Sequence, residues 1–239
     1  MSKIDYNNLP KHIGIILDGN GRWATKRGLP RELGHKEGVE AIKRVVQAAK
    51  EIGIKVVSMY AFSTENWKRK QSEVDAIFDL LRKYLKSQEG SKDSFLSKNI
   101  QVRTMGDITK LPTDVYNFLE NLKNETKDCD GLVLNLGLNY GGRSEIISAI
   151  KSIPKDKIDS LTEQDFLSYL YTAGLPELDL VIRASGEQRL SNFMLYQCAY
   201  SEFYFPKTLW PDFNKKHLEK AIISYQTRDR RFGMIKEKK

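Results

Sequence analysis

The chain has 239 residues, 40% of them hydrophobic and 29% charged, which suffices to bury the core of one α/β domain. Lysine and arginine outnumber aspartate and glutamate by 39 to 31, and this net charge of +8 favours an anionic partner. Cys129 and Cys198 have neither metal-site nor disulfide-framework spacing, and no stretch reads as a signal peptide or a membrane span. We therefore expect a cytoplasmic protein.

Short apolar runs alternate with helical periods along the chain. Strands are predicted at 12–18, 54–62, 100–105, 132–138, 179–183 and 202–205. Apolar residues recur with helical spacing over 39–49, 74–85, 115–122 and 161–170, and a last helix is predicted near 214–228. This alternation is typical of a mostly parallel central sheet of about six strands wrapped by helices. We expect a single α/β domain over residues 1–239, with 234–239 as a frayed tail.

The first predicted strand runs into Asp18-Gly19-Asn20-Gly21-Arg22. Glycines let backbone N–H groups approach an anion, a following helix adds its positive end, and the Arg22 guanidinium can bind two phosphate oxygens. The Asp18 carboxylate would repel a diphosphate unless a cation lies between them, and Mg²⁺ binds both carboxylate and phosphate oxygens. The pattern predicts a magnesium-dependent diphosphate site.

A dinucleotide-binding enzyme is the competing interpretation, because Gly19-x-Gly21-x-x-Ala24 is a variant of the nucleotide fingerprint. That fingerprint needs an acidic residue at the end of the second strand, and this strand instead runs into Ser63-Thr64-Glu65-Asn66-Trp67. A strand-turn-helix with a purely structural role stays open as well. A nucleic-acid partner is disfavoured, because the aromatic residues fall at core periods and not within a basic stripe.

A second candidate anion site is the segment Arg183-Ala184-Ser185-Gly186-Glu187-Gln188-Arg189-Leu190-Ser191. Its two arginines and a serine hydroxyl suit a phosphate group, and Glu187 could orient the arginines as an ion-pair partner. The alternative is a surface loop whose charges pair with one another. Because the carboxyl ends of parallel strands meet at one sheet edge, two anion sites there suggest transfer between two diphosphates.

Several segments in order resemble the signature regions of the cis-prenyltransferases, and most closely the pattern of bacterial undecaprenyl diphosphate synthases. The resemblance covers residues 9–233 and is carried by Asp18-Gly19-Asn20-Gly21-Arg22-Trp23-Ala24, Gly34-His35-Lys36-Glu37-Gly38, Tyr60-Ala61-Phe62-Ser63-Thr64-Glu65-Asn66-Trp67, Asn139-Tyr140-Gly141-Gly142-Arg143, the Arg183–Phe193 segment, Ser201-Glu202-Phe203-Tyr204-Phe205 and Arg230-Arg231-Phe232-Gly233. It departs from the bacterial pattern at Ala184 and Tyr196, where threonine and tryptophan are usual.

The resemblance implies an enzyme that condenses isopentenyl diphosphate onto an allylic diphosphate, usually farnesyl diphosphate, with Mg²⁺ and as a homodimer. The implied product is a long-chain polyprenyl diphosphate such as undecaprenyl diphosphate, a carrier lipid for cell-wall biogenesis. A shorter product is the alternative within the family. A greasy product together with the +8 charge also suggests contact with the inner face of an anionic membrane.

The resemblance also implies roles for individual residues. Asp18 and Asn66 are the expected catalytic residues, and Asp18 and Glu202 the expected metal ligands, with Glu202 linked to the site across the dimer. The allylic diphosphate is expected at Gly19, Asn20, Gly21, Arg22, Trp23, Arg31 and His35. The residues expected to bind isopentenyl diphosphate, or to belong to a mobile segment over the substrates, are Ser63, Glu65, Asn66, Trp67, Arg69, Arg183, Arg189 and Ser191. Arg231 and Gly233 belong to a tail that reaches into the partner's site, and Glu73 matches an acidic residue just beyond the mobile segment.

Two interpretations stay open for the remaining groups. His35 could donate to a phosphate or act as the base that removes a proton. The apolar stripe of the helix over 72–86 could be plain core or one wall of a hydrophobic tunnel for the growing chain. In the second case Ala61 and Val39 would lie at the tunnel mouth, and Leu132 or Leu134 would form its floor.

Overall fold

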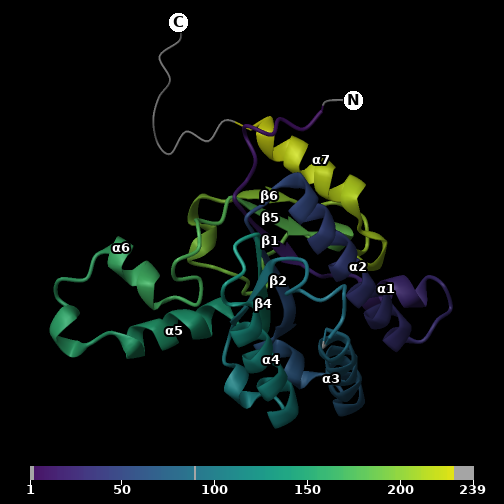
Figure 1. Cartoon of the computed structure of the whole chain (residues 1–239), viewed down its shortest axis with the longest axis horizontal. Coiled ribbons are helices and arrows are strands. Elements are labelled where there is room, and N and C mark those ends of the chain that lie inside the picture. Colours follow the sequence, from purple (N-terminus) through teal and green to yellow (C-terminus); the bar gives the residue numbers. More distant parts are fainter. Residues whose placement is uncertain (1–2, 89, 229–239) are drawn as a thin grey trace, which may run out of the picture.

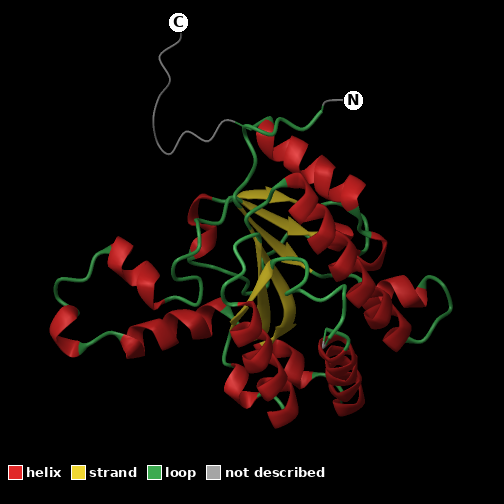
Figure 2. Ribbon diagram, viewed as in Figure 1, coloured by secondary structure: helices red, strands yellow, loops and turns green. Residues whose placement is uncertain are grey.

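A parallel sheet forms the centre of the molecule, and helices surround it (Figures 1 and 2). The computed structural model describes residues 3–88 and 90–228. Within them, each pair of neighbouring strands is parallel, and the strand order is β3-β4-β2-β1-β5-β6. The strands are β1 His12–Ile16, β2 Val56–Ser63, β3 Ile100–Met105, β4 Leu132–Tyr140, β5 Leu180–Arg183 and β6 Glu202–Tyr204. All six predicted strands are thus confirmed.

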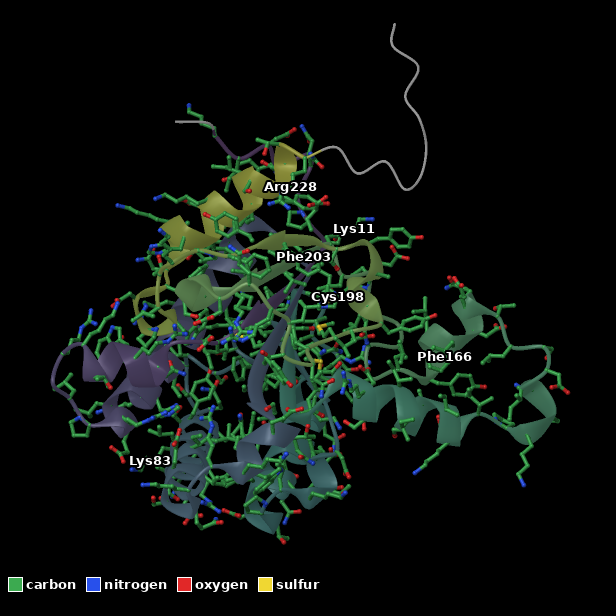
Figure 3. The ribbon with its side chains drawn as sticks, turned by 180° about the vertical axis from the view of Figure 1, so that it is seen from behind. Lys11, Lys83, Phe166, Cys198, Phe203 and Arg228 are labelled. Carbon is green, nitrogen blue, oxygen red and sulfur yellow. The ribbon has the colours of Figure 1, made fainter. Side chains whose placement is uncertain are left out.

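The α-helices are α1 Asn20–Thr25, α2 Arg31–Ile52, α3 Gln71–Lys86, α4 Thr113–Thr126, α5 Gly142–Ser152, α6 Glu163–Phe166 and α7 Lys215–Gln226. The main core joins one face of the sheet to α2, α3, α4 and α7. A smaller core on the other face is covered by the irregular segment 190–198 and contacts Phe203 of β6; Cys198 and Phe203 are labelled in Figure 3. Because both faces are covered, the strands are nearly continuous apolar runs.

The region 142–170 is where the sequence prediction was least accurate. Helix α5 was not predicted, and the helix expected over 161–170 is only α6 followed by a 3₁₀ turn at Leu167–Tyr169. These elements project from the body as an arm, on which Figure 3 labels Phe166 (Figures 1 and 3). Ile147 and Ile150 of α5 are 53% and 50% exposed, so the apolar residues of this helix do not follow the pattern of a helix packed on the core.

Three buried polar side chains form a line across the sheet at the amino-terminal part of its strands. Nε2 of His12 lies 2.7 Å from Oγ of Ser58. The same Oγ accepts a hydrogen bond of 3.0 Å from Nδ2 of Asn135. Nδ1 of His12 lies 2.9 Å from the carbonyl oxygen of Pro176 and therefore donates to it. Neutral imidazole satisfies both contacts, and burial lowers the pKa of His12 to about 4.

We predict that His12 makes the protein less stable as the pH falls from about 6.5, the pKa of His12 in the unfolded chain, to about 4. The unfolded chain binds a proton over this interval and the folded chain does not, which amounts to about 3 kcal/mol of unfolding free energy at full effect. Urea unfolding of the wild type and of His12→Gln at pH 7 and pH 4.5 measures it. The variant should lose less stability between these pH values, and an equal loss in both proteins contradicts the assignment.

Candidate active site

A cavity of about 710 Å³ opens at the carboxyl ends of the strands. Its polar lining comes from the residues that follow β1, β2 and β5 and from α2: Asp18, Gly19, Asn20, Gly21, Arg22, Arg31, His35, Ser63, Glu65, Asn66, Arg69, Arg183, Ser191 and Asn192. Its apolar lining comes mainly from α2, α3, β2 and β4: Val39, Ile42, Ala61, Phe62, Ile77, Phe78, Leu80, Leu81, Tyr84, Leu136 and Leu138. Such a site can hold a charged head group and a hydrocarbon tail together.

The glycines after β1 allow the chain to turn tightly into α1. Gly19 has a φ of +108°, a conformation that other residues rarely adopt, and α1 begins at the next residue. Helix α2 passes so close to this turn that a Cβ on Gly34 would lie 2.1 Å from the carbonyl oxygen of Asn20. The glycine turn into α1 is therefore closely packed against α2, with Oδ1 of Asn20 buried and without a hydrogen-bond partner.

Asp18 is held between two guanidinium groups at the cavity wall. Its Oδ2 accepts hydrogen bonds from Nη2 and Nε of Arg183, at 2.8 and 3.3 Å, and its Oδ1 lies 3.2 Å from Nη2 of Arg22. Burial acts to raise the pKa of Asp18, but the hydrogen bond and the charge of Arg183, together with Arg22, outweigh it and lower this pKa. The carboxylate is therefore ionised at neutral pH.

The loop after β5 joins the two predicted anion sites into one. Nη1 of Arg183 donates to the carbonyl oxygen of Arg189 at 2.6 Å and to Oγ of Ser191 at 2.7 Å. Glu187 was expected to orient Arg183 and Arg189, but it binds Arg189 and Arg22, because Arg183 is taken up by Asp18. Neither Arg189 nor its partner Glu187 lines the cavity, but Glu187 also pairs with Arg22, which does.

A second cluster of charges surrounds Glu73 and reaches the cavity through Arg31, His35 and Arg69. Oε1 of Glu73 is 3.0 Å from Nη1 of Arg69, 3.5 Å from Nη2 of Arg31 and 3.5 Å from Nε2 of His35. Burial and then the charge of Arg69 lower the pKa of His35, so the imidazole is neutral at pH 7. The cluster presents two guanidinium groups and one imidazole, which are donors that suit phosphate oxygens.

The segment after β2 forms a 3₁₀ helix, η1 Thr64–Lys68, that borders the cavity. The N–H of Ser63 donates to Oδ1 of Asn66 at 3.0 Å, and Ser63, Glu65, Asn66 and Arg69 all line the cavity. Trp67 does not line it. The Trp67 indole packs against Phe62 and Phe78, with ring centroids 5.0 and 5.5 Å away.

Trp23 was expected at the allylic diphosphate but does not line the cavity. Its Nε1–H donates to Oδ1 of Asp212 at 2.7 Å, and the guanidinium of Arg27 lies 4.2 Å from its ring centroid. Trp23 lies on the side of α1 that turns toward the 210–213 segment, because each turn of a helix divides its residues between faces. Its position corrects the sequence expectation.

Glu202 does not share a site with Asp18 within one chain. It begins β6 and aligns through Leu180 with Ile13, whereas Asp18 follows the opposite end of β1. Its carboxylate pairs with Arg228, which Figure 3 shows at the end of α7, at 2.6 Å. A metal site that includes both Asp18 and Glu202 would therefore need two copies of the chain. That site stays a prediction. Arg231, Gly233 and the tail lie outside the described residues.

The oxygen donors at the cavity suit Mg²⁺. Asp18 supplies a carboxylate and Asn20 a buried amide oxygen without a partner, and Mg²⁺ is held by one or two carboxylates with water and substrate phosphates. Among residues 3–88 and 90–228 there is no group of three or more His, Cys, Asp and Glu side chains placed to hold a metal. A magnesium ion here would therefore take most of its ligands from substrate and water.

The α3 stripe contributes both to the core and to the cavity lining. Val74 and Leu85 lie in the core alone, Ile77 and Leu81 line the cavity, and Phe78 and Tyr84 are buried core residues that also line it. Val39 and Ala61 line it as expected. The expected floor was wrong, because Leu136 and Leu138 of β4 line the cavity and Leu132 and Leu134 do not.

Comparison with known proteins agrees with this geometry. Residues 16–233 match the family model described as a putative undecaprenyl diphosphate synthase. An isoprenyl transferase of Clostridium tetani is 52% identical over 98% of this chain and 92% of its own length. One of Fusobacterium nucleatum is 47% identical over 96% of this chain and 98% of its own length.

Two solved structures have the same fold. Lavandulyl diphosphate synthase from Lavandula x intermedia, solved in complex with dimethylallyl diphosphate, has a TM-score of 0.87 and 33% identity and covers 95% of this chain and 99% of its own. A probable undecaprenyl diphosphate synthase from Campylobacter jejuni has a TM-score of 0.77 and 34% identity, covering 95% and 100%. The dinucleotide interpretation is thereby set aside. The chain belongs to the undecaprenyl diphosphate synthase family of isoprenyl transferases and is a prenyltransferase.

Proposed function

We propose that this enzyme elongates an allylic diphosphate, farnesyl diphosphate, with isopentenyl diphosphate in a Mg²⁺-dependent cis condensation that gives a long-chain polyprenyl diphosphate. The observation that carries this proposal is the single cavity that combines a cationic mouth with an apolar interior. The mouth provides two sets of phosphate donors, one around Arg22 and Arg183 and one around Arg31, His35 and Arg69. The interior provides room for hydrocarbon.

The chemistry requires that charge be stabilised on the leaving diphosphate. As the allylic C–O bond breaks, negative charge grows on the phosphate oxygens, and guanidinium groups and α1 N–H groups already in place stabilise it. Mg²⁺, held by Asp18 and Asn20, would neutralise the same oxygens. His35 is neutral and lies beside Arg31 and Arg69, which supports a role as a donor to phosphate.

Asp18→Asn tests the metal role, and we expect it to lower turnover at least about a hundredfold because a metal ligand in the transition state is lost. Condensation of labelled isopentenyl diphosphate onto farnesyl diphosphate across a Mg²⁺ titration measures this. Glu187→Gln is the matched control, since Glu187 is a carboxylate that pairs with Arg22 but does not follow β1. Near-normal turnover of Asp18→Asn at saturating Mg²⁺ would contradict the assignment of Asp18 as a metal ligand.

We further propose that Tyr84 sets the upper limit of product length. A second cavity of about 280 Å³ lies between α2, α3 and the 91–100 segment, and Tyr84 is the residue that lines both cavities. The ring is 7% exposed and meets Phe95 edge-on at 5.9 Å. Beyond it Val46, Phe95 and Ile100 are apolar, and the other lining residues are polar: Lys43, Gln47, Ser87, Gln88, Ser91, Asp93 and Lys98. Hydrocarbon entering there would desolvate these groups without replacing their hydrogen bonds.

Replacing Tyr84 by alanine should therefore lengthen the products. The truncation joins the two cavities, so chains that stop at the ring gain up to 280 Å³ of further space. Mass spectrometry of the products, at a fixed ratio of the two diphosphates, gives the length distribution. Tyr84→Phe keeps the ring and should leave that distribution unchanged. Identical distributions for alanine and phenylalanine would show that the ring is not the stop.

A homodimer is proposed through the α5–α6 arm. Ile147 and Ile150 are about one turn apart on α5 and are both half exposed, and Ile158 beyond them is 53% exposed. The arm projects away from the sheet (Figure 2). A two-fold axis would bury the same patch of both copies against itself, which removes these side chains from water.

Ile147→Asp combined with Ile150→Asp should convert the dimer to monomers, because two buried carboxylates without partners oppose association. Analytical ultracentrifugation at micromolar concentration measures this, with Lys151→Asp on the same helix as the control for added charge. An unchanged dimer of the double variant places the interface elsewhere.

Membrane contact is proposed from charge alone. The net charge of +8 suits an anionic lipid surface, from which a polyprenyl product would be handed on. Among the described residues, no helix combines the length and apolarity that crossing a bilayer requires.

A further inference from the structure

The end of β4 and the residues that follow it contact the segments at the cavity mouth, although the proposed chemistry gives them no role. Asn139 is 6% exposed, and its Oδ1 accepts the Nε1–H of Trp67 at 2.8 Å. Its Nδ2 donates to the carbonyl oxygen of Asp107 at 2.8 Å. Both polar atoms of one buried amide thus hold η1 against the body of the protein through Trp67.

Asn192 makes the second connection, from the loop after β5. Its carbonyl oxygen accepts the N–H of Gly142 at 2.7 Å, and its Oδ1 accepts the N–H of Arg143 at 2.9 Å. Its Nδ2 donates to Oε1 of Glu65 at 2.9 Å, in η1. Asn192 also directly follows Ser191, whose hydroxyl accepts a hydrogen bond from Arg183.

Both asparagines adopt an uncommon backbone conformation where they make these contacts. Asn139 has a φ of +46° and Asn192 a φ of +67°, in the left-handed region that asparagine tolerates better than most residues. Gly141 leaves the space in which the two loops meet, because a Cβ there would lie 2.7 Å from Nδ2 of Asn192 and 2.8 Å from Oγ1 of Thr64. Unfavourable backbone conformation kept at such a junction points to a functional constraint.

We infer that Asn139 and Asn192 are positioning residues for prenyl transfer. Asn192 couples η1, which presents Glu65 and Asn66 to the cavity, to the loop after β5 that carries Ser191. Asn139 holds η1 against the turn after β3 through Trp67 and Asp107. A diphosphate that orders the loop after β5 thereby holds η1 over the bound substrates, and one binding event aligns both. This inference rests on the proposed function, in which that loop receives isopentenyl diphosphate.

Limited trypsin digestion tests the coupling apart from catalysis. Trypsin cleaves after lysine and arginine, and the exposed residues Lys68, Arg69 and Lys70 lie at the end of η1 and directly after it. The probe ligand is inorganic pyrophosphate with MgCl₂. It should slow cleavage at 68–70 in the wild type, as mass spectrometry of the fragments shows. Asn192→Asp keeps the acceptor for Arg143 but turns a carboxylate toward Glu65, so cleavage there should be about tenfold faster and the protection by pyrophosphate lost.

Glu65→Gln added to Asn192→Asp should restore the contact with donor and acceptor exchanged, and with it the protection. Asn121→Asp, on the exposed part of α4, controls for the added charge. Trp67→Phe tests the other connection, because it removes the N–H and keeps a ring between Phe62 and Phe78. In both connections kcat should fall about tenfold, with a much smaller change in the KM of the allylic diphosphate.

The inference is overturned if Asn192→Asp is cleaved at 68–70 like the wild type, or if Glu65→Gln gives no rescue in a protein that circular dichroism shows to be folded. Failure of the proposed function is distinguishable. In that case the wild type incorporates no isopentenyl diphosphate, while the digestion pattern still reports whether η1 and the loop after β5 are coupled.

Discussion

The contact between Asp18 and Arg183 is the interaction on which the rest of the site depends. It joins the end of β1 to the end of β5, and the side chains of Arg183 and Asp18 are 6% and 25% exposed, so neither charge is fully solvated. Leaving one of these charges without the other would be costly in such a place, which fixes their relative position. The same guanidinium holds Arg189 and Ser191, and therefore sets the course of the whole loop after β5.

This arrangement also explains how a very apolar cavity can begin beside strong charges. The carboxyl ends of the strands, α1 and the loop after β5 bring cations to the mouth, and the charges there are largely paired with one another. Deeper in the cavity the lining residues of α2, α3, β2 and β4 are apolar as far as Tyr84. Binding a diphosphate would exchange carboxylate partners of the arginines for phosphate, while the tail replaces water in the interior.

The loops at the mouth are not independent of each other. The Asn192 side chain connects the loop after β5 to η1, the Asn139 side chain holds η1 against Asp107, and Gly141 leaves room where the segments meet. Side-chain amides suit this task because each provides a donor and an acceptor in fixed geometry without adding charge to a site that is already highly charged. Ordering one loop then lowers the free-energy cost of ordering the other.

The sequence by itself determined the alternation of strands and helices, and hence the parallel sheet, because β-branched runs and helical periods are local properties. It also determined which residues carry charge at the strand ends, so that much of the polar cavity lining was predictable, including Asp18, Arg22 and Arg183. Helix α5 was missed because Ile147 and Ile150 face outward, so its apolar residues do not mark one core-facing stripe.

Only the tertiary structure decided which charges pair. Glu187 bridges Arg22 and Arg189, Glu73 gathers three basic side chains, Trp23 turns to Asp212, and Glu202 lies at the far end of its strand. Each of these depends on sheet register and on which face of a helix meets a neighbour, and neither is encoded in local spacing. Residues far apart in the sequence, such as Asn192 and Glu65, become partners because β5 and β2 flank β1 and their loops leave the sheet at the same edge.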